Sequence, residues 1–266
     1  MPDGSLIARF GRARRDARLA VLEGLHPLKH ALRFHAEVLE AVTPDAAGLA
    51  RLAAELAPDL LETLPRLVRE IDRDVFAQLS PLAPSTGVMA LAQRPAVDVR
   101  ALLDEPRDAP LVLLEDPRDL GNLGACVRVA AAADAAGVLT GGSHDPWHPD
   151  ALRGAAGLHF ALPVVRLERP QALLEPTGHT GGGDARGGRP LLALDPAGEP
   201  LDPASLPPRA LLAFGTERHG LSDGLLEAAE RRVSIPMRAG VSSLNLATSV
   251  AAVLFARRFA ERAGGH

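Results

Sequence analysis

Three short apolar runs in the last third of the chain stop abruptly at a polar residue, a glycine or a proline. They are Leu191–Leu194 before Asp195, Leu211–Phe214 before Gly215, and Val233–Ile235 before Pro236. Runs of this kind are typical of strands buried in a parallel sheet. In an open parallel sheet, ligands bind just beyond the carboxyl ends of the strands. We therefore predict that these ends form the walls of one pocket, and that a last helix, Ser243–Ala260, leads away from it.

The residues at these strand ends favour a nucleoside-like ligand. Gly215 lets the backbone approach a ligand closely, and Pro236 breaks the strand and turns the chain. Ser242 or Ser243 is expected to cap the last helix, whose first amides would face the pocket. The alternative is an ordinary cluster of loops, because strand ends often carry glycine and proline.

Helices and short strands alternate along the whole chain and indicate an α/β fold. We expect a small N-terminal α/β domain with its linker, residues 1–105, and a C-terminal domain on a parallel sheet, residues 106–266. The linker is the Pro-, Asp- and Arg-rich stretch Arg94–Pro110. The further C-terminal elements that we expect are strands at Leu111–Leu114, Val138–Thr140 and Leu162–Leu167, and helices at Asn122–Ala136 and Pro149–Leu158.

The composition limits the class of protein. The chain has 266 residues and 47% hydrophobic residues, which is ample for a folded core. No apolar run approaches the roughly 18 residues that cross a bilayer, so we expect no membrane association. The single cysteine, Cys126, excludes an internal disulfide and a multi-cysteine metal site. Because no apolar signal segment follows the Arg-rich N-terminus, we predict a cytoplasmic protein.

The net charge of −4 does not exclude RNA binding, which depends on a local basic surface. The densest basic run, Arg9–Arg18, is either a solvated helix start or frayed terminus, or an arm that contacts RNA phosphates. Aromatic residues total 3%, which disfavours a base-stacking platform. His26, His30 and His35 have no further ligands at metal-site spacing, so we predict no metal. Gly178–Gly188 is expected to be a mobile surface loop.

Three motifs, in order along the chain, resemble those of the TrmH/SpoU class of RNA ribose methyltransferases. The first is Asn122–Ala130, the second is Phe214–Leu221, and the third joins Ile235–Met237 to Ser243–Ser249. The resemblance covers Leu111–Ala260. More loosely, the first hundred residues resemble the RNA substrate-binding domain found in front of many of these enzymes. Val129 departs from the family pattern, which usually has a small hydroxyl residue there. Asp119 and Leu120 stand where proline is common.

This resemblance implies a C-terminal SPOUT domain with a deep trefoil knot around S-adenosylmethionine. It implies transfer of a methyl group to a ribose 2′-hydroxyl of structured RNA, either rRNA or tRNA, by a homodimer formed through the catalytic domain. No metal is required, because the sulfonium already activates the methyl group. Three residues are expected to contact the cofactor through their backbone and three to lie close by: Gly215, Ile235 and Leu244, then Leu194, Thr216 and Met237.

The resemblance also implies the catalytic residues. Arg128 would grip a phosphate and stabilise the developing 2′-oxyanion. The alternative for Arg128 is a helix-surface arginine paired with Asp134 or Glu115. Asn122 and Asn245 could orient Arg128 or the ribose, and Ser243 could bind the substrate or cap the helix. Glu217 could hold Arg128, including across a dimer interface.

Two other functions compete with this one. The first is an RNA-binding protein on a methyltransferase scaffold, with little or no catalysis. The presence of Asn122, Arg128, Glu217 and Asn245 together argues against it. The second is a dinucleotide-dependent oxidoreductase. This second hypothesis lacks support because no Gly-x-Gly-x-x-Gly turn follows the first strand of the C-terminal domain.

Overall fold

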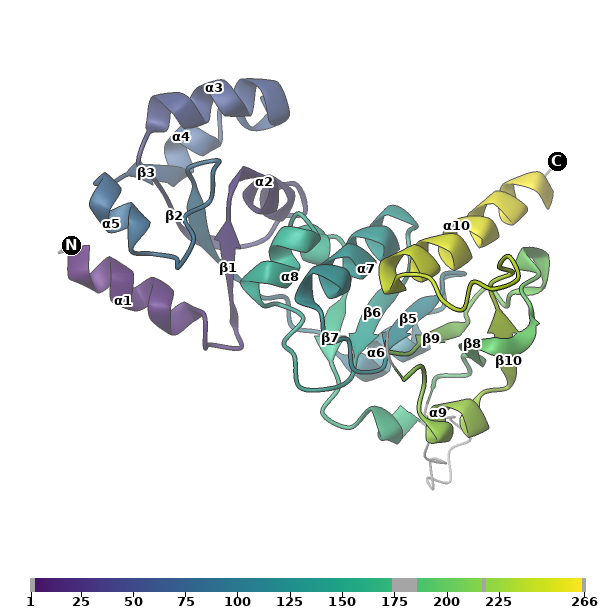
Figure 1. The fold of residues 1–266 in the computed structure, drawn as a ribbon. Helices are drawn as coiled ribbons and strands as arrows, with labels where there is room; N and C mark the ends of the chain where they lie inside the picture. The colour runs from purple at the N-terminus through teal and green to yellow at the C-terminus, as the bar shows by residue number, and fades with distance from the viewer. Residues whose placement is uncertain (1–2, 174–185, 217–218, 265–266) are drawn as a thin grey trace. The chain divides into compact units, whose positions relative to one another are not determined.

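The structure is a computed structural model that describes residues 3–173, 186–216 and 219–264 (Figure 1). It divides into two compact units. Unit 1 comprises Met1–Ala96 and Trp147–Ala161, and unit 2 comprises Val97–Pro146 and Leu162–His266. This division differs from the boundary that we predict between residues 105 and 106, because most of the linker belongs to unit 2 and a later segment belongs to unit 1. Within the described ranges no helix is long and apolar enough to cross a membrane.

Unit 1 is built on a mixed sheet with the strand order β1-β4-β2-β3. β4 pairs antiparallel with β1 and β2, and β3 pairs parallel with β2. The strands are β1 (Leu19–Glu23), β2 (Val38–Thr43), β3 (Val68–Glu70) and β4 (Met89–Gln93). The helices are α1 (Asp3–Ala13), α2 (Leu25–Arg33), α3 (Ala46–Leu56), α4 (Leu64–Leu67), α5 (Arg73–Ala77) and α8 (Pro149–Gly154), with the 3-10 turns η1 (Pro58–Leu60) and η2 (Leu158–Phe160).

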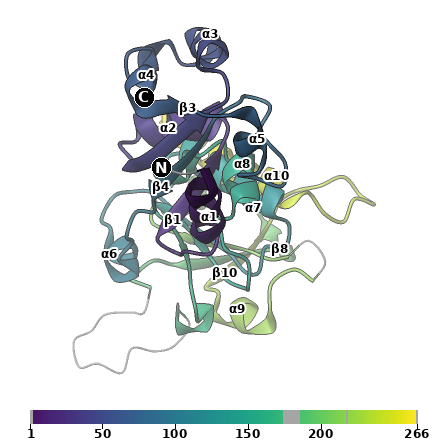
Figure 2. The same ribbon diagram turned by 90° about the vertical axis from the view of Figure 1, so that its left-hand side faces the viewer.

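Helix α1 packs across β1 (Figure 2). Leu6, Phe10 and Ala13 recur at helical spacing and are buried against the sheet. The basic run Arg9–Arg18 therefore begins inside an ordered helix. Arg9 donates to Glu40 at 2.6 Å, so part of this basic charge is neutralised within unit 1. RNA contact by the run stays a prediction.

Unit 2 is built on a sheet of the order β10-β8-β9-β5-β6-β7, in which every neighbouring pair is parallel. The strands are β5 (Leu111–Leu114), β6 (Gly137–Thr140), β7 (Val164–Arg166), β8 (Leu191–Pro200), β9 (Leu211–Phe214) and β10 (Arg231–Ser234). The helices are α6 (Val99–Asp104), α7 (Leu120–Ala132), α9 (Asp223–Ala228) and α10 (Leu246–Gly264), with the 3-10 turns η3 (Pro170–Leu173) and η4 (Pro203–Ser205). The predicted α/β fold with a parallel sheet is confirmed.

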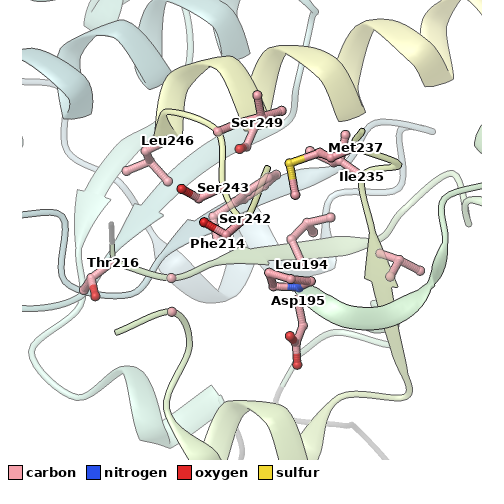
Figure 3. A pocket seen from close by; sticks show the side chains of 15 residues that line it. Leu194, Asp195, Phe214, Thr216, Ile235, Met237, Ser242, Ser243, Leu246 and Ser249 are labelled. Atoms are coloured by element: carbon pink, nitrogen blue, oxygen red, sulfur yellow. The ribbon is translucent and has the colours of Figure 1, made fainter. Parts of the chain in front are cut away.

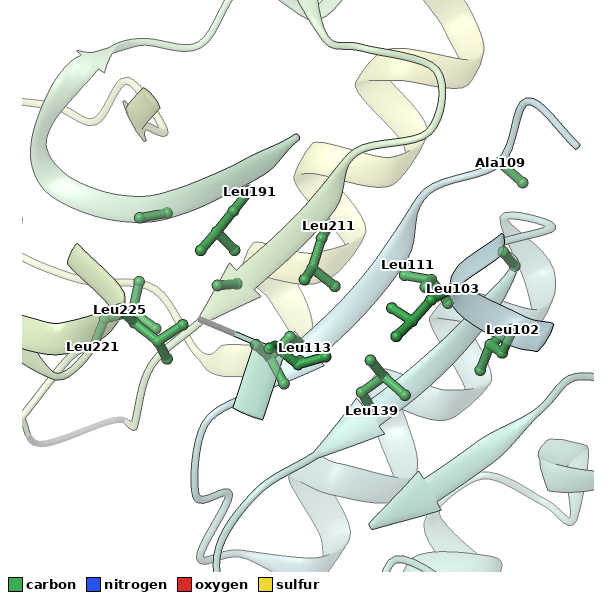
Figure 4. Close-up of a cluster of buried hydrophobic side chains, with 14 residues drawn as sticks. Leu102, Leu103, Ala109, Leu111, Leu113, Leu139, Leu191, Leu211, Leu221 and Leu225 are labelled. Atoms are coloured by element: carbon green, nitrogen blue, oxygen red, sulfur yellow. The ribbon is translucent and has the colours of Figure 1, made fainter. Parts of the chain in front are cut away.

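The core of unit 2 fills both faces of this sheet. Alternate strand residues point to one face: Leu111, Leu113, Leu139, Leu191 and Leu211. They pack with Leu102 and Leu103 of α6 and with Leu225 of α9 (Figure 4). Val112 and Leu212 point to the other face and are also fully buried. On that side α7 and α10 pack against each other.

The predicted linker Arg94–Pro110 contains a helix and contributes to this core. Asp98 caps α6 by accepting from the backbone N–H groups of Arg100 and Ala101. Leu102 and Leu103 are buried between the helix and the sheet. The boundary between the two units, at Ala96 and Val97, falls inside this predicted linker. The helix itself was not predicted, because α6 is only six residues long and its flanking residues are acidic or proline.

Arg189 is a fully buried charged side chain beside α6. Its guanidinium donates to the carbonyls of Leu103 at 2.9 Å, Ala109 at 2.9 Å and Glu105 at 3.0 Å. Burial lowers the pKa of Arg189 to about 10, and the charge of Arg209 adds to this effect. The side chain stays protonated at neutral pH and satisfies carbonyls at and just after the end of α6.

Replacing Arg189 by methionine should therefore lower the free energy of unfolding by about 2 kcal/mol, because the buried Ala109 carbonyl would lose its donor. The carbonyls of Leu103 and Glu105 would keep only their bonds from Arg209. Urea unfolding followed by circular dichroism measures this difference. The matched control is Arg262→Met, since Arg262 is exposed near the end of α10. Equal stabilities of the two variants would show that the carbonyls are satisfied without Arg189.

Candidate active site

The pocket begins where β8 leaves its ladder with β10. Ala193 pairs with Arg232, but the next paired residues are Glu199 and Val233, so residues 194–198 bulge away from β10. A side chain at Gly198 would lie 2.5 Å from the backbone carbon of Arg232, so only glycine allows the strand to return so closely. The predicted stop after Leu194 is therefore an interruption of a longer strand.

A cavity of about 380 Å³ lies beside the bulge of β8 and at the carboxyl ends of β9 and β10 (Figure 3). It is lined by Leu194, Asp195, Pro196, Phe214, Gly215, Thr216, Gly220, Val233, Ile235, Met237, Ser242, Ser243, Leu244, Leu246 and Ser249. The six residues that we expect near a cofactor all belong to this lining, and so does Ser243. The structure thus brings together residues from three strand ends and the start of α10.

The lining combines apolar walls with hydroxyl groups. Leu194, Phe214, Ile235 and Met237 supply apolar surface, and a group of hydroxyls surrounds it: Thr216, Ser242, Ser243 and Ser249. This combination fits a ligand with a flat apolar part and a polar rim. Asp195 and Phe214 were predicted only as residues at strand ends, and Ser249 was given no role in the site. Ser249 could have been found from its spacing, because it lies one helical turn after Asn245.

The second motif forms a tight turn beside the cavity. The Thr216 N–H donates to the Gly220 carbonyl at 3.0 Å, and the Gly220 N–H donates to the Thr216 carbonyl at 3.1 Å. The Thr216 hydroxyl accepts from the N–H of His219 at 3.1 Å. A Cβ at Gly215 would lie 2.0 Å from the Gly220 carbonyl carbon. This turn therefore requires glycine at position 215. Glu217 lies outside the described residues.

Asn122 and Asn245 join the first motif to the third. The amide of Asn245 donates to Oδ1 of Asn122 at 2.9 Å. The Asn245 side-chain oxygen accepts from the N–H groups of Ala247 and Thr248 at 3.0 and 3.3 Å and so caps α10. The prediction that Ser242 or Ser243 caps this helix was wrong, because α10 begins at Leu246 and its cap is Asn245.

Arg128 is exposed on α7 and is not among the residues that line the described cavity. Asn122 and Arg128 lie six positions apart on α7, and the catalytic roles implied for both stay predictions. Six residues turn a helix by about 600°, which leaves the two side chains about 120° apart around the axis. The two carboxylates of the structural alternative have other partners. Asp134 bonds to Arg107 at 2.8 Å, and Glu115 accepts from the Ser222 N–H at 2.6 Å.

A family model described as the SpoU rRNA methylase family matches residues 109–255. A 23S rRNA (adenosine(1067)-2′-O)-methyltransferase from Streptomyces azureus is 28% identical over 251 residues, which cover 92% of this chain and 88% of the relative. A 23S rRNA (uridine(2479)-2′-O)-methyltransferase from Streptomyces viridochromogenes is 32% identical over 141 residues, covering 51% of this chain and 47% of the relative. The chain spans about half the length of most of the curated relatives it matches.

The fold of the chain is also similar to solved structures. The crystal structure of the SpoU methyltransferase AviRb from Streptomyces viridochromogenes, in complex with the cofactor AdoMet, matches with a TM-score of 0.75. The two sequences are 27% identical, and the match covers 97% of this chain and 99% of that chain. The similarity therefore extends over both units and is not limited to the three motifs.

Proposed function

Because this chain belongs to the SpoU rRNA methylase family, we propose that it transfers a methyl group from S-adenosylmethionine to a ribose 2′-hydroxyl of structured RNA. The observation that carries this proposal is the gathering of the second and third motifs around one cavity, at the carboxyl ends of β9 and β10 and beside the bulge of β8. The relatives that act on 23S rRNA make ribosomal RNA the first substrate to test.

The cavity has the chemistry that S-adenosylmethionine requires. Its apolar residues, including Leu194, Ile235 and Met237, can hold the faces of the adenine. Exposed backbone at Gly215 and Leu244 can bond to its edge, and Ser242 and Ser249 offer hydroxyls to the polar rim of the ligand. The volume of about 380 Å³ lies within the range of small-molecule sites.

In the proposed reaction the ribose 2′-oxygen bonds to the methyl carbon as the carbon–sulfur bond breaks, S-adenosylhomocysteine leaves and the hydroxyl proton passes to solvent. Arg128 holds the adjacent phosphate and stabilises negative charge on the 2′-oxygen. It does not act as a base, because a guanidinium does not deprotonate in proteins. Ser243 can bond to the substrate from the cavity wall, and the bonded pair Asn122–Asn245 fixes the start of α7 against the start of α10.

We also propose that two copies associate through unit 2, so that Arg128 of one protomer reaches the cavity of its partner. The exposed position of Arg128 outside the lining of its own cavity supports this arrangement. Phe259 is 65% exposed on α10, with the ring of Phe255 6.2 Å away, and offers an apolar surface to a second copy. A trefoil knot belongs to the same proposal, supported by the match of the family model to residues 109–255.

A shared site predicts complementation between two inactive variants. Arg128→Ala keeps its cavity but lacks the arginine, whereas Gly215→Ala keeps the arginine but loses the cavity. Unfolding and refolding an equal mixture should restore about a quarter of the wild-type rate, because half of the dimers would contain one complete site. The rate of methyl transfer measures this. A mixture no more active than the separate variants would place Arg128 in the site of its own chain.

We propose that unit 1 binds the RNA outside the target nucleotide. Exposed arginines of α1 and the residues after it, among them Arg12 and Arg15, support this role.

The cytoplasmic location predicted from the sequence stays a prediction. Size-exclusion chromatography with light scattering tests the dimer independently of activity.

Radiolabelled methyl transfer tests the function. Purified protein is incubated with S-adenosylmethionine that carries a labelled methyl group, and with unmodified ribosomal or transfer RNA. Label in one RNA class is expected. RNA that is bound but never labelled, with or without divalent cations, would favour the RNA-binding scaffold over the methyltransferase.

A further inference from the structure

The segment Trp147–Ala161 belongs to unit 1 although it connects two strands of unit 2. β6 and β7 are parallel neighbours in the sheet of unit 2, so the chain between them forms a crossover. A crossover helix ordinarily packs on its own sheet. Here the crossover carries α8 and η2, and these belong to unit 1. The chain therefore passes between the units three times.

A buried carboxylate holds this segment. Glu23 lies at the end of β1, and its side chain is 2% exposed. It accepts from Arg153 of α8 at 2.6 Å, from Arg14 at 2.6 Å and from the Ser80 hydroxyl at 2.8 Å. Burial opposes ionisation of Glu23, but these hydrogen bonds outweigh it and lower its pKa. The carboxylate is therefore charged at neutral pH, and Arg153 is the partner that links it to the segment.

The backbone of the segment also fits closely against α2. Nδ1 of His30 lies 2.6 Å from the carbonyl oxygen of Ala156. Burial lowers the pKa of His30, so the neutral imidazole donates this bond. Gly157 has φ 77°, and a Cβ there would lie 2.5 Å from the Cα of Pro27. Only glycine allows this approach.

The start of the segment carries the one tryptophan of the sequence. Trp147 is 5% exposed. Its ring lies 5.1 Å from the rings of His159 and Phe160, and the guanidinium of Arg94 lies 5.9 Å from its centroid. The fluorescence of this single tryptophan therefore reports whether the segment is docked.

We propose that Trp147–Ala161 is a tether that couples unit 1 to the catalytic sheet, and that Arg153 is a positioning residue for RNA methylation. This inference rests on the proposed function. Without docking, only the connection at Ala96 and Val97 would join the units. When the segment is docked, RNA bound by unit 1 is presented to the cavity at a high effective concentration. The tether therefore affects the use of RNA and leaves the cofactor cavity unchanged.

The decisive comparison is between the two arginines that share Glu23. Arg153→Met breaks the link to the segment, whereas Arg14→Met removes the other arginine and keeps the link. In the full chain, Arg153→Met should red-shift the Trp147 emission and speed hydrogen exchange in the segment. The KM for RNA should rise about tenfold while the Kd for S-adenosylmethionine changes less than twofold. Arg153→Lys, which keeps the charge, should recover most of the loss, and Arg14→Met should leave emission and KM near wild type.

Two outcomes would contradict the proposal that the segment Trp147–Ala161 is a tether. Unchanged emission and exchange in Arg153→Met would show that the ion pair does not hold the segment. A red shift with an unchanged KM would show that docking does not position the RNA. If the wild-type chain methylates no RNA, the proposed function fails by itself. Emission, exchange and the affinity for RNA then decide the tether without any turnover.

Discussion

Replacing Arg128 by alanine should lower the rate of methyl transfer by about 1000-fold, because the developing charge on the 2′-oxygen would lose its cationic partner. The affinity for S-adenosylmethionine should change little, since Arg128 is exposed on α7 and lies outside the cavity lining. Single-turnover rates with labelled cofactor measure the first quantity, and calorimetric titration measures the second. Arg128→Lys should recover only part of the rate, because an ammonium lacks the planar fork that binds phosphate at two points.

The control for this experiment is Arg262→Ala, which removes an exposed arginine from α10. Its rate should equal that of the wild type. An Arg128→Ala variant that keeps a wild-type rate on the same RNA would remove Arg128 from the mechanism. A variant that loses cofactor affinity as well would instead assign Arg128 a structural role in the cavity.

The second large effect is expected at Gly215. A single added Cβ would lie 2.0 Å from the carbonyl carbon of Gly220, which is backbone and cannot swing aside. Gly215→Ala must therefore open the Thr216–Gly220 turn that forms one wall of the cavity. We expect the Kd for S-adenosylmethionine to rise at least about 100-fold, which corresponds to roughly 2.7 kcal/mol of binding free energy. Calorimetric titration of the variant measures this loss.

Gly224→Ala is the matched control, because a Cβ at that glycine of α9 meets nothing within 4 Å. The thermal midpoint of each variant separates a local loss of the cavity from global unfolding. Normal cofactor affinity in a folded Gly215→Ala chain would show that the ligand does not use this wall. The cavity would then need another assignment.

The elements that were predicted correctly are those whose local sequence shows whether they are buried. The run Leu111–Leu114 is apolar throughout because it is buried on both faces of a parallel sheet, and the same holds for Leu211–Phe214. The helix α6 and the place of Trp147–Ala161 in unit 1 were missed. Both depend on contacts with residues far away in the sequence, such as that between Arg153 and Glu23.

In the site, too, the features that were missed depend on contacts between residues far apart in the sequence. The six residues expected near the cofactor line one cavity, because the segments that follow β9 and β10 meet at one edge of a parallel sheet beside the bulge of β8. The cap of α10 went to Asn245, which also bonds to Asn122, and no local pattern distinguishes that amide from the neighbouring serines. The bulge of β8 depends on the close approach of Gly198 to β10, a contact between strands that sequence spacing does not reveal.

The most direct test of the account is to identify the methylated atom. RNA treated with the protein and labelled S-adenosylmethionine is digested to nucleosides and analysed by mass spectrometry. We predict that the label is found in a 2′-O-methylated nucleoside, and that Arg128→Ala and Gly215→Ala both eliminate it. Label on a base, or the same 2′-O-methylated product from both variants, would contradict the account.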